Sequence, residues 1–272
     1  DNDFRNWAVV TDYGAVPNDP GDDTGEIQAA LNSGKPTVFL PSGTYRISGT
    51  LHIPSTVRRV LGVISQITIW NTQRAAYPVF SCDAASGGPV EIRSIVFDIY
   101  SVGKPSILNN CAVPLVIADV FNANGYENVP GKGLEVYFEN AAIPGGVIQH
   151  GGRVWARQLD VENDATHVLN DGATFWVLGY KTEGSGDSGN GLLFTRNGGS
   201  TEVIGAFNST PDAGPYARPA YSAVDSKLSI SALSAGYRIG KVLSEQRNGQ
   251  TVTYPNSNTR YGGTALSLYS GR

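Results

Sequence analysis

A repeat of 21 residues restricts the fold of this chain more than any other feature of its sequence. Residues 149–162 and 170–183 are two copies with matching turns, aromatic positions and closing acids. The alignment pairs Gly151 with Gly172, Trp155 with Trp176 and Glu162 with Glu183. A period near 20 residues that combines short strands with glycine turns is typical of a solenoid.

A third copy, residues 197–208, follows at a spacing of 27, and we assign the extra residues to the Gly/Ser-rich insert 184–191. Each copy contains β-branched and aromatic residues followed by a turn with Gly, Asn or Asp, which predicts strand, bend and strand. Neither regularly spaced leucines nor a helical period is present, which argues against leucine-rich and all-helical repeats. We therefore predict a parallel β-helix.

Similar strands precede the repeats at residues 90–98, 114–120 and 134–140. The residues that close successive strands are 21, 20, 21 and 21 positions apart, so we expect them to stack in one ladder: Asp98, Asp119, Glu139, Asp160 and Lys181. Further strands are expected at residues 36–40, 45–47, 66–70, 191–195 and 228–233.

The one helix that we predict spans residues 26–32, where an apolar stripe follows Asp22 and Asp23 and precedes Gly34. Acidic residues before a helix and a glycine after it are typical start and stop signals. Placed before the first coil, this helix would shield the backbone groups at the open end of the solenoid. The expected organisation is one domain, residues 1–272, with a cap at 1–35, coils at 36–240 and a C-terminal cover or tail at 241–272.

The N-terminal segment carries a family resemblance in the run Asp12-Tyr13-Gly14-Ala15 and in the strand and turn of residues 38–45. It resembles the opening of the pectate lyase-like superfamily, especially glycoside hydrolase family 28-related proteins and family 55-type β-1,3-glucanases. The resemblance implies an all-β fold, a single-domain right-handed parallel β-helix, usually on a secreted polysaccharide-active protein. It carries over no catalytic residue, because the polygalacturonase series Asn-Thr-Asp, Asp-Asp, His-Gly and Arg-Ile-Lys is not found. Family 55 enzymes also have two tandem helices, and this chain has room for one.

Composition limits the classes of partner. Only 16% of the 272 residues are charged and the net charge is −4, so no basic stripe can follow a phosphate backbone and we expect no nucleic-acid partner. No run of 18 apolar residues occurs, so we expect no membrane partner. The lack of Met and the start at Asp1 suggest a processed or trimmed, secreted protein. A homotrimer and a larger parent protein both stay open.

Two cysteines, Cys82 and Cys111, lie 29 residues apart, about one coil plus a loop. Stacked coils are about 4.8 Å apart, which is close to the Cα separation that a disulfide needs. A secreted protein favours the bridge, whereas a reduced protein would keep two buried thiols. The sequence leaves both states open.

The central members of the predicted ladder, Asp119, Glu139 and Asp160, are our candidates for catalysis. Glycoside hydrolysis needs two carboxyl groups about 5 Å apart for retention or about 6.5–9.5 Å apart for inversion. Ladder neighbours about 4.8 Å apart and next-nearest members at about twice that distance do not choose between these mechanisms. Stacked carboxylates repel, which raises the pKa of at least one and suits it to act as a general acid. The alternatives are a purely structural polar ladder and a Ca²⁺ ion bound between the carboxylates. No other metal or cofactor is expected, and the three histidines show no metal-ligand spacing.

Residues near the ladder are candidates for substrate binding: Arg157, Lys181, Glu162, Glu183 and Trp155. Trp155 lies two residues before Arg157 on one predicted strand, so both side chains should point to the same side. An exposed Trp155 would form a sugar-stacking platform beside a cation. The alternative is that Trp155 and Trp176 stack inside the core.

Three functions fit these features. The leading one is a secreted glycoside hydrolase that acts on a neutral glucan-type polysaccharide with paired carboxylates. The second is a non-catalytic carbohydrate-binding or tailspike-like attachment module. The third is a calcium-dependent polysaccharide lyase, in which Arg157, Lys181 or His150 would abstract a proton.

Overall fold

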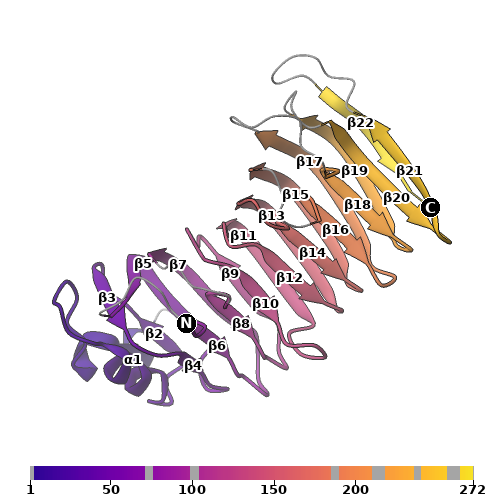
Figure 1. Ribbon diagram of the computed structural model, residues 1–272. Coiled ribbons are helices and arrows are strands. Elements are labelled where there is room, and N and C mark those ends of the chain that lie inside the picture. Colours follow the sequence, from indigo (N-terminus) through magenta and orange to yellow (C-terminus); the bar gives the residue numbers. More distant parts are fainter. Residues whose placement is uncertain are drawn as a thin grey trace. The chain divides into compact units, whose positions relative to one another are not determined.

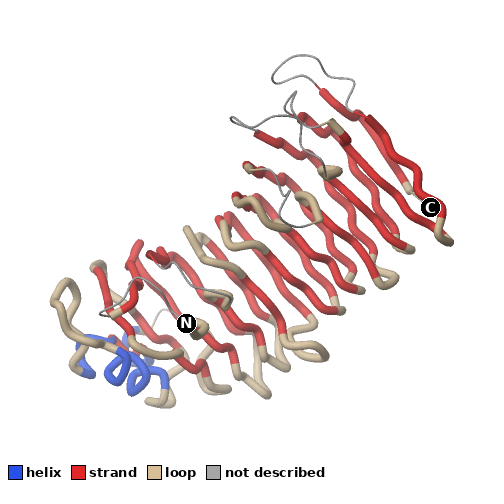
Figure 2. The backbone as a smooth tube through the Cα atoms, in the orientation of Figure 1, coloured by secondary structure: helices blue, strands red, loops and turns tan. Residues whose placement is uncertain are grey.

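The computed structural model describes residues 3–70, 76–98, 104–184, 190–209, 218–235, 240–255 and 264–271. They form a mostly β, parallel β-solenoid of about seven turns with one short helix (Figures 1 and 2), which confirms the fold predicted from the repeat. The chain divides into two compact units, Asp1–Ile143 and Pro144–Arg272. The single-domain organisation stays a prediction.

In the first unit, successive strands alternate between a long-stranded and a short-stranded parallel sheet. The long sheet contains β1 (Trp7–Val9), β2 (Thr37–Phe39), β5 (Arg59–Ile69), β7 (Val90–Asp98), β9 (Leu115–Ala118) and β11 (Glu135–Ala142), with β3 (Thr44–Ile47) also beside β5. The short sheet contains β4 (Leu51–Ile53), β6 (Phe80–Cys82), β8 (Ile107–Asn109) and β10 (Tyr126–Asn128). Each full coil supplies one strand to each sheet.

The second unit repeats this alternation and ends in antiparallel strands. Its long-sheet strands are β13 (Arg153–Glu162), β15 (Thr174–Glu183), β17 (Ser200–Ser209), β19 (Lys227–Ala235) and the antiparallel β22 (Thr264–Ser270). Its short-sheet strands are β12 (Val147–His150), β14 (Val168–Asp171), β16 (Leu193–Arg196), β18 (Tyr221–Val224), β20 (Lys241–Arg247) and the antiparallel β21 (Gln250–Pro255). The described part of the predicted cover or tail, residues 241–272, thus extends both sheets.

The predicted helix is α1 (Thr24–Leu31), which follows the short 3-10 turns η1 (Phe4–Asn6) and η2 (Val10–Tyr13). Asp22 Oδ1 accepts the N–H of Thr24, the first residue of the helix, at 3.0 Å, and the N-cap residue Asp23 makes no side-chain capping bond. Asp23 instead accepts the N–H groups of Val16 and Arg46, at 2.9 and 3.0 Å, and so fastens the preceding loop to β3. None of the helices in the described ranges is long and apolar enough to span a membrane.

Gln28 of α1 continues the short sheet with its side chain. Its Nε2 donates to the carbonyl of His52 at 3.0 Å, and its Oε1 accepts the N–H of His52 at 2.7 Å. Because β4 is the first strand of that sheet, the Gln28 amide takes the place of the peptide group that a further strand would offer. This contact explains how the helix shields the end of the sheet.

The 21-residue register is confirmed between β13 and β15, where Trp155 pairs with Trp176 and Glu162 with Glu183. The third copy is displaced by one residue from the predicted alignment. Trp176 pairs with Glu202, a spacing of 202 − 176 = 26, whereas the predicted spacing was 27. A shift of one residue turns every side chain of a strand to the opposite face.

The predicted acid ladder is confirmed at its last step, where Asp160 pairs with Lys181. In the first unit, Glu139 pairs with Ala118, and Ala118 pairs with Arg93. Asp98, Asp119 and Glu139 are therefore not stacked on one another, and that part of the ladder prediction is wrong. The physical reason is that the coils differ in length, so equal spacing of acids does not mean equal position on the coil.

Several strands of the long sheet bend at, or end just before, a residue in the left-handed region of φ. In the first unit these residues are Ile64, Ser94, Asp119 and Asn140, with φ between 50° and 57°. In the second unit they are Gln158, Gly179 and Gly205, with φ of 57°, 77° and 72°. The bend residues, not the acids, are the positions that align between coils, and Asp119 is one of them.

The core of the second unit leaves both tryptophans outside. Val154 and Ala156 are buried on either side of Trp155, and Phe175 and Val177 are buried on either side of Trp176. The alternative in which the two tryptophans stack in the interior is wrong, because smaller residues and a phenylalanine fill those core positions. Trp155 and Trp176 are half-buried on the outer face.

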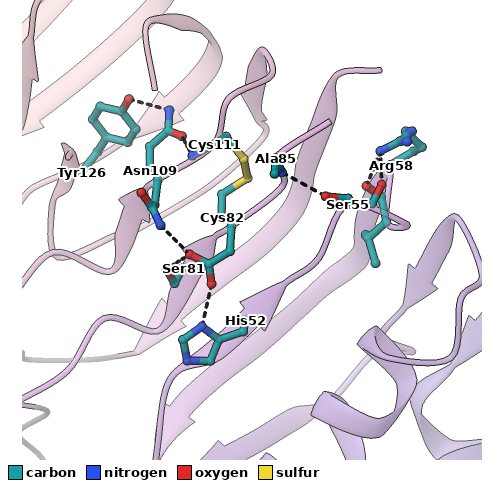
Figure 3. Close-up of a disulfide and its surroundings, with 12 residues drawn as sticks. His52, Ser55, Arg58, Ser81, Cys82, Ala85, Asn109, Cys111 and Tyr126 are labelled. Atoms are coloured by element: carbon teal, nitrogen blue, oxygen red, sulfur yellow. Dashed lines mark hydrogen bonds and ion pairs between the residues drawn. A yellow bond between two sulfur atoms is a disulfide. The ribbon is translucent and has the colours of Figure 1, made fainter. Parts of the chain in front are cut away.

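Of the two states that the sequence leaves open for Cys82 and Cys111, the structure has the disulfide, in the first unit (Figure 3), with a Cα–Cα separation of 5.3 Å. Both cysteines are buried. Nearby, Asn109 accepts the N–H of Cys111 at 3.1 Å and donates to the hydroxyl of Tyr126 at 3.0 Å. The bridge thus joins two coils next to a buried polar network.

Candidate functional site

An aromatic groove lies on the outer face of the second unit. It has a volume of about 460 Å³ and is lined by Trp155, Thr174, Phe175, Trp176, Ser200 and Glu202. The two tryptophans are Cα partners on adjacent coils, so their indoles are neighbours along the stack. Outward alternation along β13, β15 and β17 brings all of these side chains except the inward Phe175 to one face.

Arginines flank the groove on β13. The guanidinium of Arg153 lies over the ring of Trp155, 5.6 Å from its centroid, which is a cation–π contact. Arg157 is exposed two residues beyond Trp155, on the same outward row, as the sequence predicts. This face of β13 therefore combines the apolar ring of Trp155 with the hydrogen-bond donors of Arg153 and Arg157.

Beyond the bend residues, three carboxylates surround one ammonium. Lys181 Nζ lies 3.0 Å from Glu183 Oε1 and 3.4 Å from Asp160 Oδ2, and it also forms an ion pair with Glu162. The four side chains are between 34% and 39% exposed, so the cluster is reachable from solvent. We call Asp160, Glu162, Lys181 and Glu183 the carboxylate cluster.

Asp160 is the perturbed acid of this cluster. Burial raises the pKa of its carboxyl group and the charge of Glu183 raises it further, although Lys181 lowers it. Its Oδ1 atom is buried and has no hydrogen-bond partner among the described residues. A carboxyl group that is partly desolvated and lies beside other carboxylates is suited to keep its proton and to donate it as a general acid.

The structure brings together four of the eight predicted site residues in the carboxylate cluster, with Trp155 and Arg157 on the same outer face of β13. Asp119 and Glu139 belong to the first unit. There Asp119 accepts hydrogen bonds from Arg93 and from Asn140 at 2.5 and 2.9 Å, and Arg93 also donates to Glu91 at 2.6 Å. Asp119 thus lies in a polar network at the bend.

Two groove residues were missed or misplaced by sequence reasoning. Trp176 was considered for the core, and Glu202 was not selected at all. The predicted spacing of 27 aligns Glu202 with the inward Phe175, whereas the actual register aligns it with Trp176. The alternation of polar and apolar residues within 200–204 is the signal that could have corrected this register.

A Ca²⁺ ion, which the sequence leaves open as an alternative, does not fit the carboxylate cluster. The ammonium of Lys181 occupies the position between the carboxylates where an ion would have to bind. Among the described residues, no group of three or more His, Cys, Asp or Glu side chains is arranged to hold a metal ion. We therefore derive no metal-dependent step at this site.

Residues 5–60 match the family model described as rhamnogalacturonase A/epimerase, pectate lyase-like. Over this segment the chain is similar to the pectate lyase-like superfamily. The matched segment contains the run from Asp12 to Ala15 on which the resemblance was based. Comparison with curated protein sequences gives no significant match.

Solved structures similar to this chain include the surface adhesin PfbA of Streptococcus pneumoniae, at 12% identity and a TM-score of 0.44, over 92% of this chain and 94% of that one. The mannuronan C-5 epimerase AlgE6 A-module of Azotobacter vinelandii is similar at 14% identity and a TM-score of 0.38, over 89% and 90%. ORF18 of Geobacillus virus E2 is similar at 11% identity and a TM-score of 0.41, over 98% and 76%. At these identities the similarity concerns the fold alone.

Proposed function

We propose that this β-helix binds a polysaccharide on the outer face of β13, β15 and β17. The observation that carries the proposal is the register pair Trp155 and Trp176, which line one groove instead of filling the core. Indole faces pack against the apolar faces of sugar rings, and the polar edges of the groove can bond their hydroxyls. Glu202, Thr174 and Ser200 supply such polar groups.

The buried Cys82–Cys111 disulfide supports an extracellular location for this binding function. Disulfides persist in oxidising compartments and are rare in the cytosol. Polysaccharides of cell walls and surfaces are available in that location. A secreted, glycan-binding protein is thus consistent with both the groove and the cross-link.

Hydrolysis of the bound polysaccharide is a second candidate, favoured by the raised pKa of the Asp160 carboxyl group. Asp160 would protonate the leaving oxygen, and Glu162 or Glu183 would act as nucleophile or base. The ion pairs with Lys181 hold both glutamates in place. The lyase alternative is less favoured, because Lys181 takes the place of its calcium ion.

A binding experiment with matched variants tests the proposal. Purified protein is titrated with soluble neutral glucans and with uronic polysaccharides, and binding is followed by calorimetry. We expect Trp155→Ala and Trp176→Ala each to weaken binding at least tenfold, because each loses a stacking surface. Trp70→Ala removes a tryptophan of the first unit that is 38% exposed, and it should bind like the wild type. Equal binding by all three variants would refute the groove as the site.

Reducing-end release by the same protein tests hydrolysis. If Asp160 is the general acid, Asp160→Asn should abolish release while binding persists, because the amide cannot donate the required proton. Glu139→Gln is the control variant, because the sequence also predicted Glu139 as catalytic but the residue belongs to the first unit. Binding without reducing ends by the wild type would leave a carbohydrate-binding module and remove the hydrolase.

A further inference from the structure

The groove and the carboxylate cluster lie on either side of the bends in the long strands. Gly179 and Gly205 occupy the bend positions of β15 and β17, where β13 has Gln158. A Cβ atom added to Gly205 would meet no other atom within 4 Å, so the space above it is open. On these two coils the outward side chains between the groove and the bend are the apolar Leu178 and Ile204, and the bend itself carries no side chain.

An exposed aromatic ring lies on the far side of these bends. Phe207 is 42% exposed and is the Cα partner of Lys181 on the adjacent coil. Its neighbours along β17, Ala206 and Asn208, are both buried, so the phenylalanine is the outward residue there. Phe207 therefore borders the carboxylate cluster opposite to Asp160, since Lys181 lies between them in the register.

The negative charge of the carboxylate cluster discriminates between charged and uncharged sugars. Three carboxylates share the single ammonium of Lys181, so the cluster has an excess of negative charge when Asp160 is ionised. A uronate unit placed here would be repelled, whereas an uncharged sugar would not. The exposed ring of Phe207 offers the apolar surface that such a sugar can cover.

We propose that an uncharged glycan crosses the bend, from the Trp155–Trp176 groove over Gly179 and Gly205 to a second stacking position at Phe207. This inference rests on the proposed polysaccharide binding and adds its path and its chemical class. Five residues separate Glu202, at the groove, from Phe207, which is at most about 17 Å along a strand. The site therefore recognises a chain of several sugar units, and the glycan passes over the carboxylate cluster.

The test compares short and long ligands. Neutral gluco-oligosaccharides of increasing length, both β-1,3- and β-1,4-linked, are titrated into the full chain. We expect Phe207→Ala to lower the affinity for the long oligosaccharides about tenfold and to leave the disaccharides unchanged. Trp155→Ala should weaken short and long ligands alike, because it removes the first stacking position.

A bend variant tests the path independently. Gly205→Gln introduces the side chain that β13 already accepts at the same position, and it should also weaken only the long ligands. Gly198→Gln is the matched control, since Gly198 has φ 74° and open space around it but lies in the turn before β17. It should bind every length like the wild type.

The outcomes separate the two proposals. Loss of all binding in Trp155→Ala, with no length dependence in Phe207→Ala and Gly205→Gln, would keep the groove and overturn the path. Tighter binding of oligouronates than of neutral oligosaccharides would overturn the uncharged class. Failure of the wild type to bind any oligosaccharide would overturn the proposed function and this inference together.

Discussion

Lys181 Nζ lies 3.0 Å from Glu183 Oε1 while the same ammonium also pairs with Asp160 and Glu162. One cation thus pairs with three carboxylates on adjacent coils. Because each side chain is more than a third exposed, solvent weakens the individual pairs, and their joint contribution to stability is on the order of 1 kcal/mol. The ammonium also excludes a divalent cation from this position.

Lys181→Met should lower the free energy of unfolding by about 1 kcal/mol and should create a calcium-sensitive protein. The three carboxylates lose their counterion, and oxygen ligands of this kind suit Ca²⁺. Thermal melts with CaCl₂ and with EDTA provide the measurement. The variant should gain stability with calcium, whereas the wild type and Lys181→Arg should not respond. A wild type that responds like Lys181→Met would contradict this explanation.

Stability should fall on acidification because of His167. This buried ring accepts from Thr182 Oγ1 at Nδ1 and bonds the carbonyl of Asn163 through Nε2 at 2.6 Å, which satisfies the neutral form. Burial lowers the pKa of His167 below its ordinary value of 6.5, against the opposing charge of Asp164. Above pH 6.5 the neutral ring is favoured in both states, and its contribution to stability is fully present.

As the pH falls below 6.5, the unfolded state gains a proton first, so each pH unit down to the folded-state pKa costs about 1.4 kcal/mol. Denaturant unfolding at several pH values between about 7.5 and about 5 measures this slope. His167→Gln should be less stable at neutral pH and should show a flatter slope. An identical slope in both proteins would assign the pH dependence to other groups.

Ile64 should be replaceable with a gain in stability. It has φ 56°, a left-handed conformation that costs a β-branched residue on the order of 1–2 kcal/mol, and its side chain is 72% exposed. Ile64→Asn should therefore raise the free energy of unfolding by about 1 kcal/mol. Ile64→Val keeps the β-branch and should match the wild type in the same urea titration. No difference between the Asn and Val variants would show that this bend is not strained.

Removing the disulfide should cost about 3–4 kcal/mol, because the bridge closes a loop of 29 residues in the unfolded chain. The double variant Cys82→Ala/Cys111→Ala tests this in urea. Since both sulfurs are buried, incubation of the folded wild type with dithiothreitol, followed by removal of the reductant before the melt, should leave the melting temperature unchanged. Rapid loss of stability under native reducing conditions would mean that the bridge opens readily to solvent.

The repeat period was sufficient to predict the solenoid, since adjacent coils of equal length preserve the alignment of Trp155 with Trp176 and of Asp160 with Lys181. It failed where coil length changes. The bend residues Ser94 and Asp119 are 25 positions apart, whereas Asp119 and Asn140 are 21 apart. Acids at a constant spacing therefore do not keep the same position on successive coils. Only the residues that pair in the ladder reveal such a change.

The candidate site was predictable in part for the same reason. The carboxylate cluster lies on coils 21 residues apart, where the alignment is right, and it was predicted almost complete. Glu202 lies after an insert, where an error of one residue turned it inward in the alignment. The outward direction of Trp155 depends on which neighbours fill the core, and the pattern of one strand does not decide that.

The Gln28 side chain that pairs with both backbone groups of His52 has a consequence for assembly. An open first strand is a template on which another chain can add by hydrogen bonding, the step that starts sheet-to-sheet fibre growth. At His52 both polar groups that would receive such a chain are already occupied, at 2.7 and 3.0 Å. The side-chain amide of Gln28 therefore blocks this position of the edge strand, and a strand of another molecule cannot add to the short sheet there.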